Sequence, residues 1–416
     1  MDASVILTII IVIISADFLL DRVLDYLNLS NQKNELPNTL KGIYDEEKYL
    51  KSLAYNRAQT KFSFITSAFS FALAFFMLYG GGFGILDSWL RPFFQDPIIL
   101  ALAFFAVLFF ASDIITIPFQ WYSTFVLEEK FEFNKTKPKT FVLDKIKGYV
   151  LTLVLGGGIL WILLYLINML DANFWIYFWI VISAVILLTN MFYTTLIVPL
   201  FNKLTPLEDG ELKEAIKAYS QKINFPVHNI FVIDGSKRSS KANAFFSGIG
   251  KKKKIVLYDT LIKNHSVEEL VAVLAHEVGH YKKKHIIFGF IFSVLQIGVM
   301  LFIMSFMIFN QELSLALNGT QTAIHLNLIA FAILYSPISK VTGLLMNILS
   351  RKNEFEADAF ATTTFNGQAL QIALKKLSVN NLSNLLPHSL YVFFNYSHPP
   401  LLQRLEAIEI IQNQAK

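Results

Sequence analysis

The chain has 416 residues, of which 54% are hydrophobic and 16% are charged. Its mean hydropathy of +0.49 excludes an ordinary soluble protein. The net charge is +5, but the excess Lys and Arg lie in loops between apolar runs, which argues against a nucleic-acid partner.

Seven apolar stretches predict transmembrane helices, near residues 4–21, 62–80, 97–119, 148–169, 173–199, 286–310 and 323–349. The first has no basic region before it and no small-residue cleavage site, so it predicts a retained span. Of the 36 Lys and Arg residues, only Arg91 lies outside the segments on one side of these spans. The positive-inside rule makes that crowded side cytoplasmic.

These spans divide the chain into four parts. Residues 1–199 hold spans one to five and the cytoplasmic loops 21–61 and 120–147, and residues 286–349 hold spans six and seven. The outer loops are too short to form domains. Soluble chemistry must therefore be built from the cytoplasmic segments 200–285 and 350–416.

Two acidic residues, Asp17 and Asp113, lie inside or at the edge of apolar spans. Buried intramembrane acids are usually functional or face a wet cavity. A position at a helix end explains them equally well. The sequence leaves both explanations open.

Segment 200–285 predicts a small α+β unit. Residues 207–223 have a helical period, 229–234 form a strand pattern, and 243–262 predict two strands around a turn rich in Gly and Lys. Ser266 is followed three residues later by Glu269, which predicts a capping box and the start of a helix.

That helix carries the motif H-E-x-x-H as His276, Glu277 and His280. Two histidines four residues apart share one helix face and can bind one zinc ion, while the glutamate can act as general base. Chance placement of two histidines on an amphipathic helix is the plainer alternative. The chain has only eight histidines, and the helical context is the one that the motif requires.

A third ligand has to be a carboxylate or another histidine, because the chain has no cysteine. Glu354 and Asp358 in SRKNEFEADAFA share a helical face, whereas Glu356 points the other way. One of the pair would bind zinc and the other would brace a ligand histidine; a solvated acidic face is the alternative. His280 lies about 9 Å of helix rise before span six. A site at the membrane boundary suits membrane-attached or lipid-bearing substrates.

Five stretches together resemble the type I CAAX prenyl endopeptidases over about residues 20–410: STFVLEEKFEFNK, NAFFSG, VLAHEVGH, SRKNEFEADAFA and NYSHPPLLQRL. The resemblance implies a mainly α membrane protein with seven transmembrane helices around a water-filled chamber. A small cytoplasmic α+β zinc metallopeptidase domain of the gluzincin type would close it. Members of this family remove the three residues that follow a prenylated cysteine.

The resemblance also implies roles for single residues. One zinc ion per chain would be held by His276, His280 and Glu354, with Glu277 as catalytic base and Asp358 and Arg404 supporting the site through hydrogen bonds. His398 would assist at the developing oxyanion, and Asn243, Ala244 and Phe245 would pair with the substrate backbone. The remaining histidines are expected to be non-catalytic: His228, His265, His285, His325 and His388.

His398 also makes chemical sense without the resemblance. A peptidase needs a donor for the oxyanion, and the SHPP sequence holds this histidine in an extended turn. A histidine in a surface loop is an equally good interpretation.

The sequence thus predicts an integral-membrane zinc endopeptidase acting on a peptide or protein substrate, prenylated or not, in contact with membrane lipid. A quality-control protease for non-prenylated membrane proteins is the first alternative, and a transporter or channel is a weaker one. We expect a multi-pass protein of a bacterial inner membrane, or of the endoplasmic reticulum in a eukaryote. Oligomeric state is not determined by the sequence.

Overall fold

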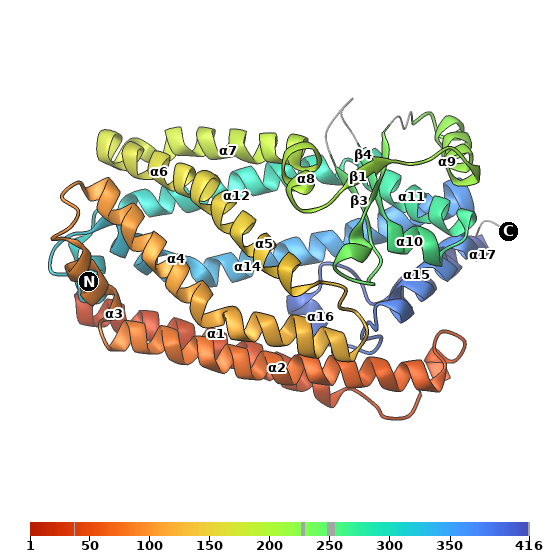
Figure 1. Cartoon of the computed structure of the whole chain (residues 1–416), viewed down its shortest axis with the longest axis horizontal. Helices are drawn as coiled ribbons and strands as arrows, with labels where there is room; N and C mark the ends of the chain where they lie inside the picture. Colours follow the sequence, from red (N-terminus) through yellow and green to blue (C-terminus); the bar gives the residue numbers. More distant parts are fainter. Residues whose placement is uncertain (37, 226–228, 248–253, 415–416) are drawn as a thin grey trace.

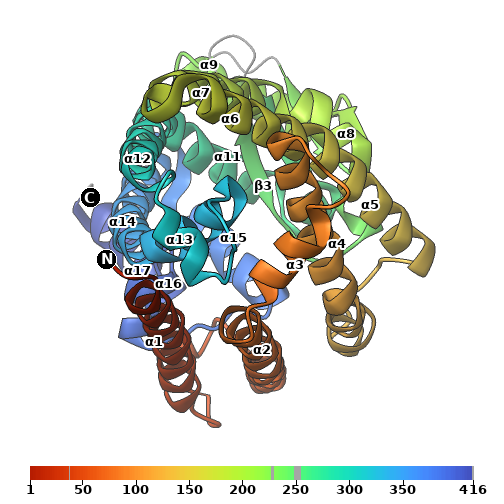
Figure 2. The same cartoon turned by 90° about the vertical axis from the view of Figure 1, so that its left-hand side faces the viewer.

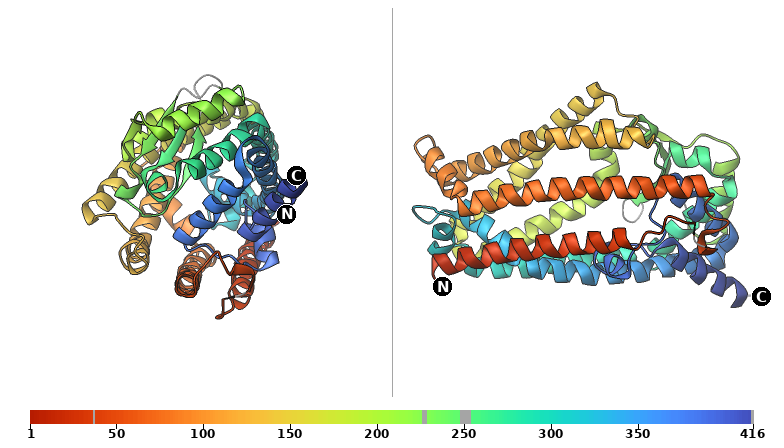
Figure 3. Two further views of the ribbon diagram at one scale, coloured as in Figure 1. Left: turned by 90° about the vertical axis from the view of Figure 1, so that its right-hand side faces the viewer. Right: turned by 90° about the horizontal axis from the view of Figure 1, so that it is seen from below.

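The computed structural model describes residues 1–416 except 37, 226–228, 248–253 and 415–416. Long helices run along the molecule, and a small sheet with shorter helices lies at one end (Figure 1). The two termini lie at opposite ends of this long axis, with the C-terminus at the end that carries the sheet (Figure 3).

The apolar part of the chain forms a bundle of helices that appears as a ring when viewed from its end (Figure 2). Its helices are α1 (Ala3–Ser30), α2 (Glu46–Tyr79), α3 (Gly82–Leu90), α4 (Pro97–Tyr122), α5 (Pro138–Leu151), α6 (Gly157–Leu170), α7 (Phe174–Phe192), α8 (Val198–Phe201), α12 (His285–Met307), α13 (Gln311–Ala316) and α14 (Ile324–Ala361).

Six helical stretches among the described residues are long and apolar enough to cross a membrane, where the sequence predicted seven. The predicted spans 148–169 and 173–199 fall within one helical stretch, Pro138–Phe201. A short 3₁₀ turn at Asp171–Asn173 joins α6 to α7, and these two helices pack against each other (Figure 1). The two counts differ because the connection between α6 and α7 is itself helical, so that these two predicted spans form one continuous helical stretch.

Two helices extend well beyond their predicted spans. The helix α2 begins at Glu46, where Asp45 caps it, so much of the predicted loop 21–61 is helical. Tyr49 and Leu53 of this extension are buried in the same core as the sheet. The extension is therefore stabilised by apolar burial. At the other side, α14 continues unbroken from the membrane segment to Ala361.

A four-stranded sheet has the strand order β1 (Leu204–Pro206), β2 (Ile230–Ile233), β4 (Lys254–Tyr258), β3 (Ala244–Ser247). The strands β2 and β4 are parallel, and the other two pairs are antiparallel. The prediction missed β1 and extended the last strand into what is α10. The turn predicted between β3 and β4 lies outside the described residues.

Five of the remaining helices share the core of this sheet, and α16 (Ser389–Asn395) packs instead against α1 and α14. The five are α9 (Glu211–Lys222), α10 (Asp259–Asn264), α11 (Val267–Lys282), α15 (Gly367–Asn380) and α17 (Leu401–Gln414). One buried core joins Leu257 of β4, Leu274 of α11, Leu370 of α15 and Ile408 of α17. The two sequence segments 200–285 and 350–416 therefore share one hydrophobic core.

Candidate active site

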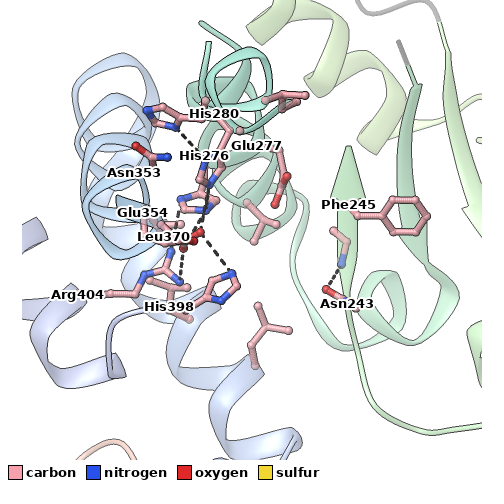
Figure 4. Close-up of a pocket in the computed structure, with 18 of the residues that line it drawn as sticks. Asn243, Phe245, His276, Glu277, His280, Asn353, Glu354, Leu370, His398 and Arg404 are labelled. Carbon is pink, nitrogen blue, oxygen red and sulfur yellow. Dashed lines mark hydrogen bonds and ion pairs between the residues drawn. The ribbon is translucent and has the colours of Figure 1, made fainter. Parts of the chain in front are cut away.

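The helices α11 and α14 bring three potential metal ligands together. The Nε2 atoms of His276 and His280 are 3.2 Å apart, and Glu354 Oε1 lies 3.2 Å from His280 Nε2. One ligand atom from each residue lies within 4.8 Å of the others. Figure 4 shows the two histidines on α11 pointing at the carboxylate on α14.

The local sequence explains how these helices approach so closely. Ser266 caps α11 and forms the predicted capping box with Glu269, which fixes where the helix begins. A Cβ on Gly279 would lie 3.0 Å from the Cα of Ala357 and 3.2 Å from Phe360 Cβ. Glycine in the motif and alanine on α14 thus allow the two backbones to pack together.

The donor set fits a metal cation. Glu354 is 4% exposed, and its Oε2 atom makes no hydrogen bond among the described residues, although the Arg404 guanidinium lies 3.3 Å from it. Arg404 is shared with Asp358, so this buried carboxylate has room for a further cation that would offset the cost of its burial. Two imidazoles and one carboxylate are a known open ligand set for a catalytic metal.

A second layer of contacts orients the ligands. The His276 Nδ1 atom lies 2.8 Å from Asp358 Oδ1, and the Arg404 guanidinium donates to both Asp358 oxygens at 2.7 and 2.8 Å. Arg404 is also 3.3 Å from Glu354. Burial alone would lower the pKa of Arg404, but the carboxylates of Asp358, Glu354 and Glu277 together raise it.

Glu277 and His398 face the same cluster. Burial raises the pKa of Glu277 above its ordinary value, and this effect outweighs the neighbouring histidines. His398 Nε2 lies 3.3 Å from Glu354 Oε1, yet two thirds of its side chain (66%) is exposed. Ser397 Oγ lies 3.0 Å from its Nδ1. His398 therefore reaches Glu354, one of the potential metal ligands, from an exposed turn.

The proposed ligands share one cavity of about 660 Å³ with the other polar groups of the site. The cavity is lined by His276, Glu277, His280, Glu354, His398 and Arg404. One wall contains Asn243, Ala244 and Phe245, and β3 lies across the cavity from the histidine helix (Figure 4). In the described sheet β3 is an outer strand, so one row of its backbone groups has no strand partner. The Phe245 ring points away from the histidines and packs beside Val256.

The structure places the other histidines in different settings. His265 Nδ1 lies 3.0 Å from the Leu261 carbonyl, His325 is 2.7 Å from Asp87 at the far end of the bundle, and His388 caps α16. His228 lies outside the described residues.

His285 lies closer to the site than the sequence predicts. It follows His280 by five residues, a spacing that does not place the two on one helix face. However, α11 ends at Lys282, the φ of 61° at Lys284 turns the chain into α12, and His285 Nδ1 lies 3.0 Å from His280 Nδ1. The lysines before it gave no signal of such a turn.

The two intramembrane acids are paired. Asp17 is 3.0 Å from Lys340, and Asp113 is 2.5 Å from Lys145 and accepts from Tyr149. They line two further cavities between the helices. Cation pairing explains why these acids are present at such positions.

Comparison with known proteins gives the same result for both halves of the chain. Residues 25–203 match the family model described as CAAX prenyl protease N-terminal, five membrane helices, and residues 206–412 match peptidase family M48. The chain belongs to the CAAX prenyl protease family of M48 peptidases. The protein is therefore a multi-pass membrane metalloendopeptidase. This family membership supports an enzyme rather than a transporter or channel.

Individual relatives agree with this family membership. CAAX prenyl protease 1 of Saccharomyces cerevisiae is 34% identical, covering 94% of this chain and 92% of its own length. A homologue from Arabidopsis thaliana is 36% identical over 90% of each chain. The crystal structure of S. mikatae Ste24p matches this M48 peptidase with a TM-score of 0.92 at 33% identity, covering 97% of this chain and 99% of that one.

Proposed function

We propose that this M48 peptidase is a zinc endopeptidase that cleaves prenylated CAAX chains near their C-terminus. The observation that carries the proposal is the single cavity in which His276, His280 and Glu354 meet Glu277 and His398 beside an unpaired strand edge. The names of the curated relatives supply the CAAX class of substrate.

Zinc suits this cavity because two imidazoles and one glutamate are the ligands of a typical catalytic zinc site with an open fourth position. His276, His280 and Glu354 would hold one ion per chain, and Asp358 with Arg404 would fix the orientation of His276. Zinc bound there would polarise the scissile carbonyl and acidify a water molecule.

The protein residues perform the proton transfers. Glu277 takes a proton from the attacking water and delivers it to the leaving amine, and burial, which raises its pKa, makes the carboxylate a stronger base in the first step. His398 donates a hydrogen bond to the developing oxyanion. The substrate backbone pairs with β3 at Asn243, Ala244 and Phe245, which makes recognition tolerant of side-chain sequence.

The cavity also supports a lipid-bearing substrate. Its wall on the membrane side is formed by Ile286 and Gly289 of α12 and by Met346 and Leu349 of α14. A second cavity of about 600 Å³ lies among the membrane helices and is lined mostly by apolar residues such as Phe178 and Met304, with the Asp17–Lys340 pair in its wall. These two cavities support the proposal of a chamber inside the helix bundle. The peptidase unit, built from residues 200–285 and 350–416, would close this chamber at one end. The distribution of Lys and Arg supports a cytoplasmic location for that unit.

A matched pair of peptides tests the substrate class. Purified protein is given a CAAX peptide with a farnesylated cysteine and the same peptide without the lipid, and the released tripeptide is measured by mass spectrometry. Faster release from the farnesylated peptide supports the proposal. Equal release from both peptides would instead support the quality-control alternative, which the strand edge and its backbone pairing also permit.

Replacing His398 with Gln should lower kcat by about 100-fold. The reason is that His398 is exposed to the cavity and its loss removes an oxyanion donor without removing a metal ligand. Steady-state kinetics and zinc content measured together test this. An H398Q variant that kept zinc and full kcat would exclude the oxyanion role, whereas the substitution H388Q at the cap of α16 should leave kcat unchanged.

Replacing Asp358 with Asn should weaken zinc binding by about 10- to 100-fold. The carboxylate accepts from His276 and from both Arg404 donors, and an amide presents one oxygen and one NH₂ group to these three donors. Zinc affinity is measured by competition with a chelator. Unchanged affinity in a folded D358N protein would contradict this role.

Acid should displace the zinc ion, because histidine ligands must be deprotonated to bind. Burial alone would lower the pKa of His280, but the carboxylates of Glu354 and Glu277 together raise it in the metal-free site. A raised pKa means that protons compete at a higher pH than for an ordinary histidine. Zinc content after dialysis between pH 8 and pH 5 should therefore fall with decreasing pH; constant zinc content across this range would refute the prediction.

A further inference from the structure

The two ligand histidines are oriented by different groups. Asp358, itself held by Arg404, orients His276. Neither of these two residues forms a hydrogen bond with the ring of His280 among the described residues. The contact partner of His280 Nδ1 is His285, the first residue of α12, which is 9% exposed. The other ring nitrogen of His285 lies 3.3 Å from Glu356 Oε2.

Hydrogen-bond chemistry fixes the direction of this chain of contacts. His280 presents Nε2 to Glu354 and His276, so this nitrogen needs a free lone pair to bind a cation. The proton of the neutral ring then sits on Nδ1 and requires an acceptor. The His285 Nδ1 atom, 3.0 Å away, accepts it only if the His285 proton sits on Nε2, where Glu356 is the acceptor.

We propose that His285, held by Glu356, is a positioning residue that fixes the tautomer and ring orientation of His280 for zinc binding. This inference rests on the proposed zinc endopeptidase function. It differs from a fourth-ligand role, because the Nδ1 atom of His285 faces Nδ1 of His280 and not the Nε2 atom that meets Glu354. The metal-ligand group of the described residues likewise consists of His276, His280 and Glu354.

The architecture gives each histidine an independent support. Arg404 comes from α17 and Asp358 from the end of α14, while His285 begins α12 after the turn at Lys284 and Glu356 lies two residues before Asp358 on α14. Glu354, Glu356 and Asp358 on one helix thus serve as ligand, support for His280 and support for His276. A partner that orients a ligand histidine typically contributes 10- to 100-fold in metal affinity.

Side-chain replacements at position 285 separate this role from simple packing. The Oδ1 atom of Asn occupies the place of His Nδ1 and can accept from His280, whereas the amide of Gln reaches only the place of Nε2. We expect H285Q and H285L to lower zinc affinity by about 10- to 100-fold, and H285N to restore most of the loss. Affinity is measured by chelator competition on the full-length protein, and the absorption spectrum of bound Co²⁺ reports ligand geometry.

Glu356 is tested through its coupling to His285. The substitution E356A should weaken zinc binding less than H285L does, and the double variant should bind zinc no more weakly than H285L alone. Lys352, which is 4.0 Å from the other Glu356 oxygen and is largely exposed, provides the control, because K352A should leave zinc affinity unchanged. Fully additive losses would show that the two residues act separately and would overturn the proposed chain.

The outcomes distinguish this inference from the function on which it rests. Wild-type affinity in H285L and H285Q, or an equal loss in H285N and H285Q, overturns the positioning role while zinc binding by the wild type leaves the function intact. Should H285L fail to fold, the comparison of H285N with H285Q decides. Failure of the folded wild type to bind zinc overturns both.

Discussion

Replacing Glu277 with Gln should lower kcat by about 1,000-fold and leave zinc in place. Glu277 lies between the two histidines on α11 and lines the cavity, but it does not belong to the metal-ligand group. Gln has nearly the same shape and cannot take a proton from water. The chemical step therefore loses its base, while His276, His280 and Glu354 remain to bind the ion.

The matched control for this variant lies on the same helix. Glu268 is exposed in the first turn of α11, so E268Q should leave kcat unchanged. Initial rates and zinc content are measured on both variants. Should E277Q keep more than about a tenth of wild-type turnover while holding zinc, Glu277 is not the base, since base removal costs about 100-fold or more.

Replacing Glu354 with Ala should reduce zinc affinity by more than about 100-fold and abolish turnover. The loss of a supporting residue alone costs about 10- to 100-fold, and Glu354 is a proposed ligand rather than a support. The substitution also leaves the buried Arg404 with one carboxylate partner fewer, so two independent favourable interactions disappear.

Zinc stoichiometry measured by mass spectrometry of digested protein, with thermal unfolding as a check on folding, tests this variant. Glu406 on α17 is exposed and gives a carboxylate control, because E406Q should bind zinc like the wild type. One tightly bound zinc per chain in folded E354A would exclude Glu354 as the third ligand and would direct attention to the neighbouring carboxylates of α14.

The parts of this fold that depend on local sequence could be predicted. Ser266 and Glu269 mark the start of α11, and the helical period then places His276 and His280 on one face. The continuation of α14 beyond the membrane was also visible, because SRKNEFEADAFA contains no helix breaker. Local propensity and capping act within a few residues, and a sequence contains that information directly.

The parts that depend on long-range contact could not be predicted. The three-residue strand β1 has no signal of its own and exists because it pairs with β2. His285 is brought to His280 by the backbone conformation of Lys284, a residue type that rarely adopts positive φ. The extension of α2 was predicted as a loop because its charged residues hide the apolar face formed by Tyr49 and Leu53.

The choice between Glu354 and Asp358 as ligand could not be made from spacing alone. Both residues lie on the same helix face, and a single sequence does not reveal which carboxylate meets which ring nitrogen. In the structure Asp358 contacts Nδ1 of His276, whereas Glu354 lies beside the Nε2 atoms of both histidines. The packing of α11 against α14 decides which carboxylate meets which nitrogen, and it joins residues that are 74 to 82 positions apart in the sequence.

Release of the C-terminal tripeptide from a farnesylated CAAX peptide by zinc-loaded, metal-stripped and zinc-restored protein is the most direct test. The proposed function predicts release by the loaded protein, its loss on stripping, and its recovery when zinc is returned. Equal release by the stripped protein would contradict a metal-dependent mechanism at His276, His280 and Glu354. The absence of release from folded, zinc-loaded protein would contradict the CAAX substrate.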